Sequence, residues 1–267
     1  MTPRTIIDWP AAIETALCSC TIFTSVRVLA DTDSTQDAAR ALSKAPGVVI
    51  VAWRQRHGRG RHGRTWSDTG EQGVAVTFVA PSCAVAHLAA ASAVATARAI
   101  EQFTGAPAGI KWPNDIVVDG QKLAGILVER VDGVALIGIG INVGQTEFSP
   151  ELTGRATSMQ LLGVEADRLD VVTALVPALD RALQMQAEEL SNQYAERDAL
   201  RGAIARLSTM NGEVEGRILR ANPFEGVILQ TSGAARTLPP ETTAVLSWQH
   251  VGYQDKPALM DRPPASR

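Results

Sequence analysis

Cysteine is scarce in this chain, and an excess of charge of either sign is missing. Its 267 residues include three cysteines, without a CxxC pair or a cluster of cysteine and histidine. This excludes a disulfide scaffold and a zinc site of the usual spacing, and predicts a reduced, cytoplasmic protein. The net charge is −3 and the pI about 5.8, whereas a protein that binds bulk nucleic acid usually carries a basic domain. Aromatic residues make up only 4%, so the stacking surfaces of single-strand binding proteins are also missing.

Export and membrane signals are absent as well. The N-terminus has no early apolar run. Residues 72–97 contain no Asp, Glu, Lys or Arg, which would suit a membrane span. Glycine, proline and polar residues interrupt the stretch, however, and argue against a span. We therefore interpret this stretch as a buried strand followed by an alanine-rich helix at about 84–103. A hydrophobic content of 45% is typical of an ordinary globular protein with one large and one small domain.

The order of predicted elements indicates a mixed α/β domain followed by a small all-β domain. A helix is expected to begin at Ser34 or Thr35, and Asp119-Gly120 is the strongest hairpin signal. Residues 168–197 are predicted to form one long helix, with Pro177 near its first turns or at a kink. The remaining strands before residue 200 are expected at 26–31, 47–53, 73–78, 109–118, 121–131 and 134–143.

An arginine- and glycine-rich segment, residues 54–64, concentrates positive charge in this acidic chain. It holds five arginines, two histidines and three glycines. Residues 58–63 match the G-x-G-x-x-G pattern, but the segment RTWSDTGEQG after them cannot form the apolar helix that a dinucleotide site needs. His57 and His62 have no carboxylate cluster nearby, so we expect no metal there. Three interpretations remain: a nucleic-acid patch, a solvated loop without a role, or a mobile loop that closes over phosphates.

A second polar stretch, KWPND at residues 111–115, favours the phosphate-binding interpretation. Lys111 and Lys122 are expected near opposite ends of a β-hairpin. Lys122 lies on an otherwise apolar strand, where a lysine is costly unless an anion meets it. A strand-edge lysine that reaches to solvent is the alternative, and Asn114 and Asp115 are also common turn residues.

Five motifs in register make the chain similar to the biotin protein ligases. They are DSTQ (33–36), QxxGRGRxGRxW (55–66), KWPND (111–115), KLAGIL (122–127) and GIGINV (138–143). The resemblance covers about residues 26–200 and extends more loosely beyond them. It implies an α+β fold, with a mixed-sheet catalytic domain of the biotin/lipoate ligase type at 26–200 and a small C-terminal SH3-like β-barrel at 201–252. An N-terminal extension (1–25) and a disordered tail (253–267) are expected around them.

The resemblance also implies a reaction and its residues. Biotin and ATP form biotinyl-5'-AMP, with Mg²⁺ as activator, and biotin then passes to a lysine of a biotin carboxyl carrier protein. Two anions meet in the first step, so the site needs cations. Catalytic roles fall on Lys122 and Arg61, and Mg²⁺ on Asp115. Residues implied at biotin are Ser34, Thr35, Gln36, Gln55, Arg59, Gly60, Arg61, Lys122 and Gly125. Residues implied at ATP or the adenylate are Arg59, Arg61, Trp66, Lys111, Asn114 and Asn142.

This sequence departs from the family's pattern in two places. Gln36 stands where the family usually has Asn, so its place among the residues at biotin rests on its position in the motif and not on its side chain. Only about 25 residues precede the region that resembles the family, too few for the DNA-binding domain of bifunctional members, so a ligase without repressor function is expected. A lipoate or octanoate ligase is the alternative within the fold, and a nucleic-acid binding module is the alternative from another class. The resemblance allows a homodimer, and we expect no specific nucleic-acid partner and no membrane.

Overall fold

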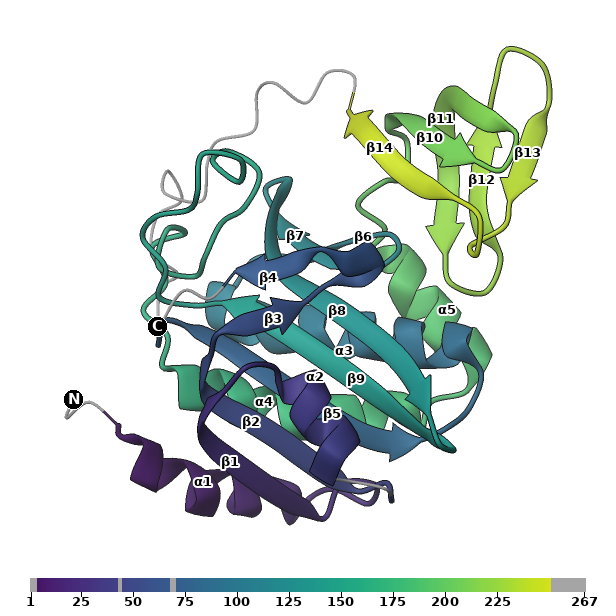
Figure 1. Ribbon diagram of the computed structural model, residues 1–267. Coiled ribbons are helices and arrows are strands. Elements are labelled where there is room, and N and C mark those ends of the chain that lie inside the picture. The colour runs from purple at the N-terminus through teal and green to yellow at the C-terminus, as the bar shows by residue number, and fades with distance from the viewer. Residues whose placement is uncertain (1–3, 43–44, 68–70, 251–267) are drawn as a thin grey trace.

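A seven-stranded mixed sheet forms the centre of the computed structural model, which describes residues 4–42, 45–67 and 71–250 (Figure 1). The strand order is β1-β2-β5-β9-β8-β7-β6. Only β1 and β2 run parallel, joined by a helical crossover, and the other neighbours are antiparallel. The mixed-sheet prediction is therefore confirmed. The strands are β1 (Ser25–Thr32), β2 (Val48–Gln55), β5 (Gly73–Pro81), β6 (Gly109–Lys111), β7 (Asp115–Val118), β8 (Gln121–Val131) and β9 (Val134–Asn142).

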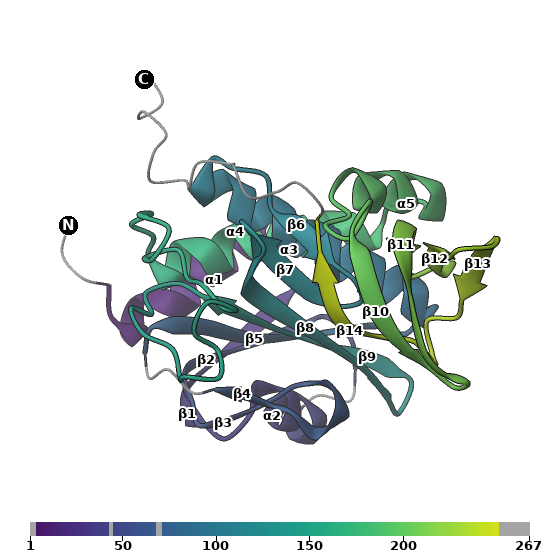
Figure 2. The ribbon, with the colours of Figure 1, turned by 90° about the horizontal axis from the view of Figure 1, so that it is seen from above.

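Four helices cover one face of this sheet, and a short helix with a hairpin covers the other (Figure 2). On the first face lie α1 (Trp9–Leu17), α3 (Val85–Thr104), α4 (Arg168–Leu183) and α5 (Ala187–Glu196); a 3-10 turn, η1 (Ile6–Asp8), precedes α1. The buried alanines of α3 let it approach the strands closely. Trp9 and Ile13 of α1 are buried in the same core, so the segment expected as an extension packs into the main body.

Helix α2 (Thr35–Leu42) lies on the opposite face of the sheet, beside the arginine-rich segment. Ser34 precedes the helix, and its Oγ accepts the backbone N–H of Asp37 at 3.4 Å, which confirms the predicted N-terminus. The arginine-rich segment, for which the sequence predicts no regular element, contains two short strands. The structure has a two-stranded hairpin there, β3 (His57–Arg59) with β4 (Thr65–Ser67), closed by a single turn η2 (Arg61–Gly63).

Two predicted turns are confirmed by the backbone. Asp119 and Gly120 have φ of 48° and 77°, and Asp132 and Gly133 have φ of 48° and 84°. Each pair therefore occupies the left-handed region that a type I′ hairpin turn requires. These turns hold β7, β8 and β9 in antiparallel register.

The prediction of one strand over 109–118 is wrong. The chain reverses within KWPND, so Lys111 at the end of β6 pairs with Asp115 at the start of β7. The Trp112–Pro113 peptide is cis and lies inside this reversal. Because β6, β7 and β8 are consecutive neighbours, Lys111 and Lys122 both approach Asp115 rather than standing at opposite ends of a hairpin.

The prediction of one helix over 168–197 is also wrong. The helix is interrupted at residues 184–186, between α4 and α5, and Pro177 lies inside α4. Side chains donate hydrogen bonds to carbonyl groups in the last turn of α4. Gln184 Nε2 donates to the carbonyl of Asp180 at 2.8 Å, and His87 Nε2 donates to that of Leu183 at 3.0 Å. These contacts satisfy the end of α4, so α5 starts in a new direction and packs on α3.

A five-stranded antiparallel sheet follows, in the order β13-β12-β11-β10-β14. It stands beside α5 and β6 (Figure 1). Its small size and antiparallel pairing agree with the predicted β-domain, and the SH3-like barrel stays a prediction. The predicted tail at 253–267 lies outside the described residues, within which no helix is long and apolar enough to cross a membrane. The strands are β10 (Ile204–Thr209), β11 (Gly212–Asn222), β12 (Gly226–Gln230), β13 (Ala235–Leu238) and β14 (Ala244–Gln249).

Candidate active site

Alternation of glycine and isoleucine along β9 produces a flat patch on the sheet. Successive side chains of a strand point to opposite faces, so Ile137, Ile139 and Ile141 enter the core, where each is at most 2% exposed. Gly138 and Gly140 then face α2 and the hairpin, and Gly125 pairs with Gly140 from β8. We call Gly125, Gly138 and Gly140 the glycine floor.

The indole of Trp66 lies directly on this glycine floor. A Cβ added at Gly140 would stand 2.5 Å from Cε2 of Trp66, and one at Gly125 would stand 2.8 Å from Cζ3. Both distances are shorter than any real contact of this kind, so alanine at either position requires the indole to move. The hairpin therefore covers the floor through its tryptophan.

A β-bulge brings Lys122 to the same face. The register of β7 with β8 shifts between Ile116 and Val117, so that Leu123 is the extra residue on β8. Leu123 is fully buried, and Lys122 turns to the other side, where its Cε and Nζ lie 3.2 Å from a Cβ added at Gly125. Bulges re-aim side chains in this way. Lys122 Nζ stands 5.5 Å from the ring centroid of Trp66.

Lys122, Lys111 and Arg61 surround one carboxylate, that of Asp115. Lys122 Nζ lies 2.6 Å from Asp115 Oδ1, with the two side chains 35% and 19% exposed. Burial lowers the pKa of Lys111, and the carboxylate of Asp115 partly offsets this effect. The positive charges of Lys122, Arg155 and Arg64 lower the pKa further. Positive charge thus exceeds negative charge here.

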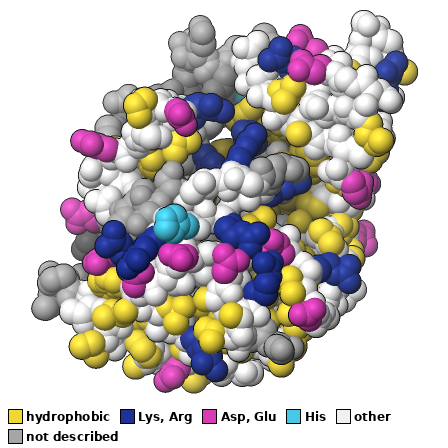
Figure 3. Space-filling model, viewed as in Figure 1, with side chains coloured by type: hydrophobic (Ala, Val, Ile, Leu, Met, Phe, Trp, Pro, Cys, Tyr) yellow, Lys and Arg dark blue, Asp and Glu magenta, His cyan; other side chains and the backbone are white. Residues whose placement is uncertain are grey.

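Arg61, at the tip of the hairpin, faces the same cluster. Burial lowers the pKa of its guanidinium, and the carboxylate of Asp115 partly offsets the change. In the space-filling view, Lys and Arg side chains gather around a hollow in the upper part of the face shown (Figure 3). A cluster of cations around one carboxylate attracts anions, so this arrangement is suited to bind one.

At the other side of the floor, Thr35 and Gln55 form a hydrogen-bonded pair. Gln55 Oε1 accepts the backbone N–H of Thr35 at 2.9 Å and lies 3.1 Å from Thr35 Oγ1. Ser34 precedes them as the helix cap and is 2% exposed. Three residues implied at biotin, one from β2 and two from the start of α2, therefore meet beside the glycine floor.

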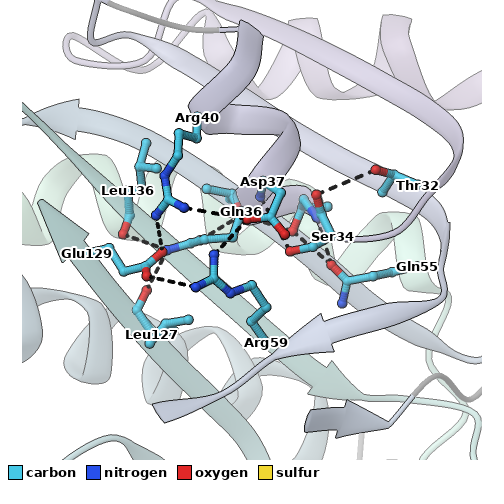
Figure 4. Close-up of polar contacts among 12 residues, drawn as sticks. Thr32, Ser34, Gln36, Asp37, Arg40, Gln55, Arg59, Leu127, Glu129 and Leu136 are labelled. Carbon is cyan, nitrogen blue, oxygen red and sulfur yellow. Dashed lines mark hydrogen bonds and ion pairs between the residues drawn. The ribbon is translucent and has the colours of Figure 1, made fainter. Parts of the chain in front are cut away.

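Gln36 turns into the sheet instead of toward the hairpin (Figure 4). Its Nε2 donates to the carbonyls of Leu136 and Leu127 at 3.2 and 3.5 Å. Thr77 of β5, fully buried, stands 3.1 Å from Gln36 Oε1 and 2.9 Å from Thr35 Oγ1. Sequence reasoning missed Thr77, because threonine is an ordinary strand residue and nothing in GVAVTF distinguishes it.

Two arginines of the hairpin region pair with carboxylates rather than stand free. Arg56 Nε lies 2.8 Å from Asp31 Oδ1, and Arg59 lies 2.7 Å from Asp37 and 3.5 Å from Glu129 (Figure 4). The second pairing ties the hairpin to α2 and β8. Ion pairs therefore hold the segment against the site face, unlike a solvated basic loop.

The remaining predicted residues hold backbone structure. Asn114 Nδ2 donates to the carbonyl of Ile126 at 3.0 Å and so pins the KWPND turn to β8. Asn142 Nδ2 donates to the carbonyl of Thr157 at 2.9 Å. The N–H of Gly60 donates to the carbonyl of Arg64 at 2.7 Å, closing the hairpin tip. Arg155, which sequence reasoning also missed, belongs to the loop beside Lys122, where the N–H of Lys122 donates to its carbonyl at 2.8 Å.

The chain resembles known proteins over most of its length. Residues 28–145 match the Biotin/lipoate A/B protein ligase family. The chain is 36% identical over 203 residues to a biotin--[acetyl-CoA-carboxylase] ligase of Mycobacterium tuberculosis, an alignment of 70% of this chain and 75% of that protein. It is 35% identical over 219 residues to the bifunctional ligase/repressor BirA of Bacillus subtilis, covering 73% of this chain and 66% of that protein.

A solved structure shares the architecture. The biotin protein ligase from Aquifex aeolicus in complex with biotin and ATP matches with a TM-score of 0.74 at 26% identity, covering 86% of this chain and all of that one (100%). The sequence identity to named ligases and this shared fold agree with the motifs that meet on the glycine floor. The chain therefore belongs to the biotin protein ligases of the biotin/lipoate A/B protein ligase family.

Proposed function

We propose that this protein activates biotin with ATP to biotinyl-5'-AMP and transfers the biotinyl group to a lysine of a biotin carboxyl carrier protein. One observation carries the proposal: Lys111, Lys122 and Arg61 converge on Asp115 beside a glycine floor. The names of the relatives supply the substrates, since they are biotin--[acetyl-CoA-carboxylase] ligases and a structure in complex with biotin and ATP.

The cations match the charge that the first step brings together. The carboxylate of biotin attacks the α-phosphorus of ATP, a P–O bond forms, and pyrophosphate leaves. Two anions approach each other in this step, so donors already in place lower the barrier. Lys122 is the residue we assign to the biotin carboxylate and α-phosphate, and Lys111 with Arg61 to the remaining phosphate charge. In the second step the carrier lysine attacks the acyl carbon and AMP leaves.

The residues present fit Mg²⁺ only together with the nucleotide. Among the described residues no group of three or more His, Cys, Asp or Glu could hold a metal. Mg²⁺ commonly binds through one or two carboxylates plus substrate phosphates, and Asp115 is the carboxylate that faces the cation cluster. We therefore assign Asp115 to a magnesium ion that is held mainly by ATP, where it would screen phosphate charge.

The hairpin is suited to cover the adenylate. A mixed anhydride hydrolyses in water, so the site must open for substrates and then exclude solvent. The hairpin is linked to the site face through the ion pairs of Arg59 and the indole of Trp66. We propose that Trp66 packs on the adenine and that Arg61 holds the phosphate when the hairpin closes.

The pairing of Arg56 and Arg59 with carboxylates counts against a nucleic-acid binding module. Guanidinium groups already neutralised by Asp31 and Asp37 contribute little to a phosphate-backbone surface. Gel-shift assays across a salt series would support the module if affinity fell steeply with ionic strength.

The proposal is tested by mass spectrometry of a biotin carboxyl carrier domain incubated with the protein, biotin and MgATP. A gain of one biotinyl group, lost when ATP is omitted or the acceptor lysine is replaced by arginine, supports it. Labelling with lipoate in place of biotin, or an unchanged carrier mass with active reference ligase in parallel, overturns it.

A further inference from the structure

A chain of four side chains runs from the core of the sheet to the proposed biotin site. Gln36 contacts Thr77, Thr77 contacts Thr35, and Thr35 contacts Gln55, with oxygen–oxygen distances of 3.1, 2.9 and 3.1 Å. Thr77, Gln36 and Thr35 are 0%, 3% and 4% exposed. Each of these three is therefore cut off from water and must find its hydrogen-bond partners inside the chain.

The direction of the first bond is set by Gln36. Its Nε2 faces two carbonyl oxygens, those of Leu136 and Leu127, so its Oε1 must face Thr77. That oxygen needs a donor, and the Thr77 hydroxyl lies 3.1 Å away. A hydroxyl has one proton. The Thr77 proton is thus directed to Gln36.

The second bond takes its direction from the first. With its proton directed at Gln36, Thr77 Oγ1 can only accept across its 2.9 Å contact with Thr35, so the Thr35 hydroxyl donates to it. Gln55 Oε1 still accepts the backbone N–H of Thr35. The reverse order, from Thr77 to Thr35 to Gln55, leaves Gln36 Oε1 buried without a donor, which is disfavoured.

The result is that Thr35 offers a ligand lone pairs and no proton. We propose that Thr77 and Gln36 are positioning residues that hold the Thr35 hydroxyl as an acceptor and so select a ligand with an N–H group. This inference rests on the proposed function, in which the N–H is that of the ureido ring of biotin. The dithiolane ring of lipoate has no N–H to donate.

Gly138 makes room for the Gln36 side chain in this arrangement. It lies opposite both Thr77 and Leu127 in the sheet, and a Cβ at this position would lie 2.5 Å from Gln36 Oε1. The absence of a side chain is what lets Gln36 reach the two carbonyls from α2. The longer glutamine thus has a place in the fold that does not require contact with the ligand.

The test compares ligands of opposite polarity in variants of Thr77. Isothermal titration measures the Kd of biotin and of its two cyclic carbamate analogues, in each of which one ureido N–H is replaced by a ring oxygen. In the unaltered protein at least one carbamate should bind tenfold or more weakly, because its oxygen meets the Thr35 lone pair. In Thr77→Val the Thr35 hydroxyl loses its acceptor in the sheet, and its proton turns to Gln55 Oε1 at 3.1 Å or to the ring oxygen of the carbamate. Biotin should then bind about two- to tenfold more weakly, the size of one neutral hydrogen bond, and the carbamate-to-biotin Kd ratio should fall at least threefold.

Two further variants keep the experiment decisive. Thr77→Ser retains the hydroxyl and should retain the wild-type ratio. Gln36→Met frees the Thr77 proton for Thr35, so it should lower the ratio as Thr77→Val does, and it carries the test if Thr77→Val does not fold. An unchanged ratio in a folded Thr77→Val or Gln36→Met protein overturns the inference while carrier labelling still supports the proposed function. Failure of the unaltered protein to bind biotin overturns both.

Discussion

Replacing Lys122 with alanine tests whether this lysine acts on the substrates or only stabilises the fold. The ammonium lies 2.6 Å from Asp115, but the two side chains are 35% and 19% exposed, so solvent screens the pair. Partly exposed pairs contribute about 0.2–1 kcal/mol, and Asp115 keeps Lys111 and Arg61 nearby. The free energy of unfolding should therefore fall by about 1 kcal/mol or less. Removing a donor aimed at charge that develops in the transition state costs roughly 100- to 1,000-fold in rate.

The assay is biotin-dependent exchange of labelled pyrophosphate into ATP, with thermal unfolding measured on the same samples. Arg130→Ala is the matched control, since Arg130 is a cation of the same strand that bonds Ser82 at 3.0 Å, away from the cluster. It should leave the exchange rate unchanged. A Lys122→Ala protein that exchanges at the wild-type rate, or that loses rate only as far as it unfolds, would refute the assignment of Lys122 to the reacting groups.

Four other experiments probe the same site. Arg61→Gly should still form the adenylate but release it, since a charge-assisted hydrogen bond contributes about 1.5–3 kcal/mol; streptavidin blots should show labelled bystander proteins, and label confined to the carrier contradicts this. Gly140→Ala should push Trp66 off the glycine floor, because the methyl group would stand 2.5 Å from the indole, and should raise the Kd for ATP about tenfold in a calorimetric titration. Gly144→Ala, whose methyl group would meet its nearest neighbour at an ordinary 3.5 Å, is the control. Burial lowers the pKa of Lys111, so its charge is lost as pH rises through that lowered pKa. ATP affinity should then fall at a pH below that at which an exposed lysine titrates, and Lys111→Met should remove this dependence. Amide exchange in residues 56–65 should be faster than in the central sheet without ligand, because a two-stranded ribbon held by solvent-screened ion pairs is only marginally stable, and should slow with biotin; equal protection in both states would mean that the hairpin is a fixed platform.

Local signals in the sequence are sufficient for much of the fold. The Asp119-Gly120 turn is predictable because its conformation depends on the two residues themselves. The strands around it are indicated by apolar runs, and the start of α2 is indicated by Ser34 as a cap. The Gly-Ile alternation of β9 is typical of a strand that another group approaches closely, and that group is the indole of Trp66.

The errors share a physical cause. The reversal inside KWPND, the break at 184–186 and the hairpin at 57–67 all depend on groups distant in the chain. His87 satisfies the end of α4 from 96 residues away, and Glu129 and Asp37 hold Arg59 against the site face. Periodicity within a window of ten or fifteen residues contains no trace of such partners.

The sequence by itself determined which chemistry the chain carries: the residue types of its five motifs and the local elements on which they lie. Only the tertiary structure decided what those residues do to one another. The bulge at Leu123 turned Lys122 toward Asp115, and the packing of α2 on β5 placed Thr77 under Thr35. Both outcomes depend on strand register and on burial away from water, which are properties of the whole sheet rather than of any segment.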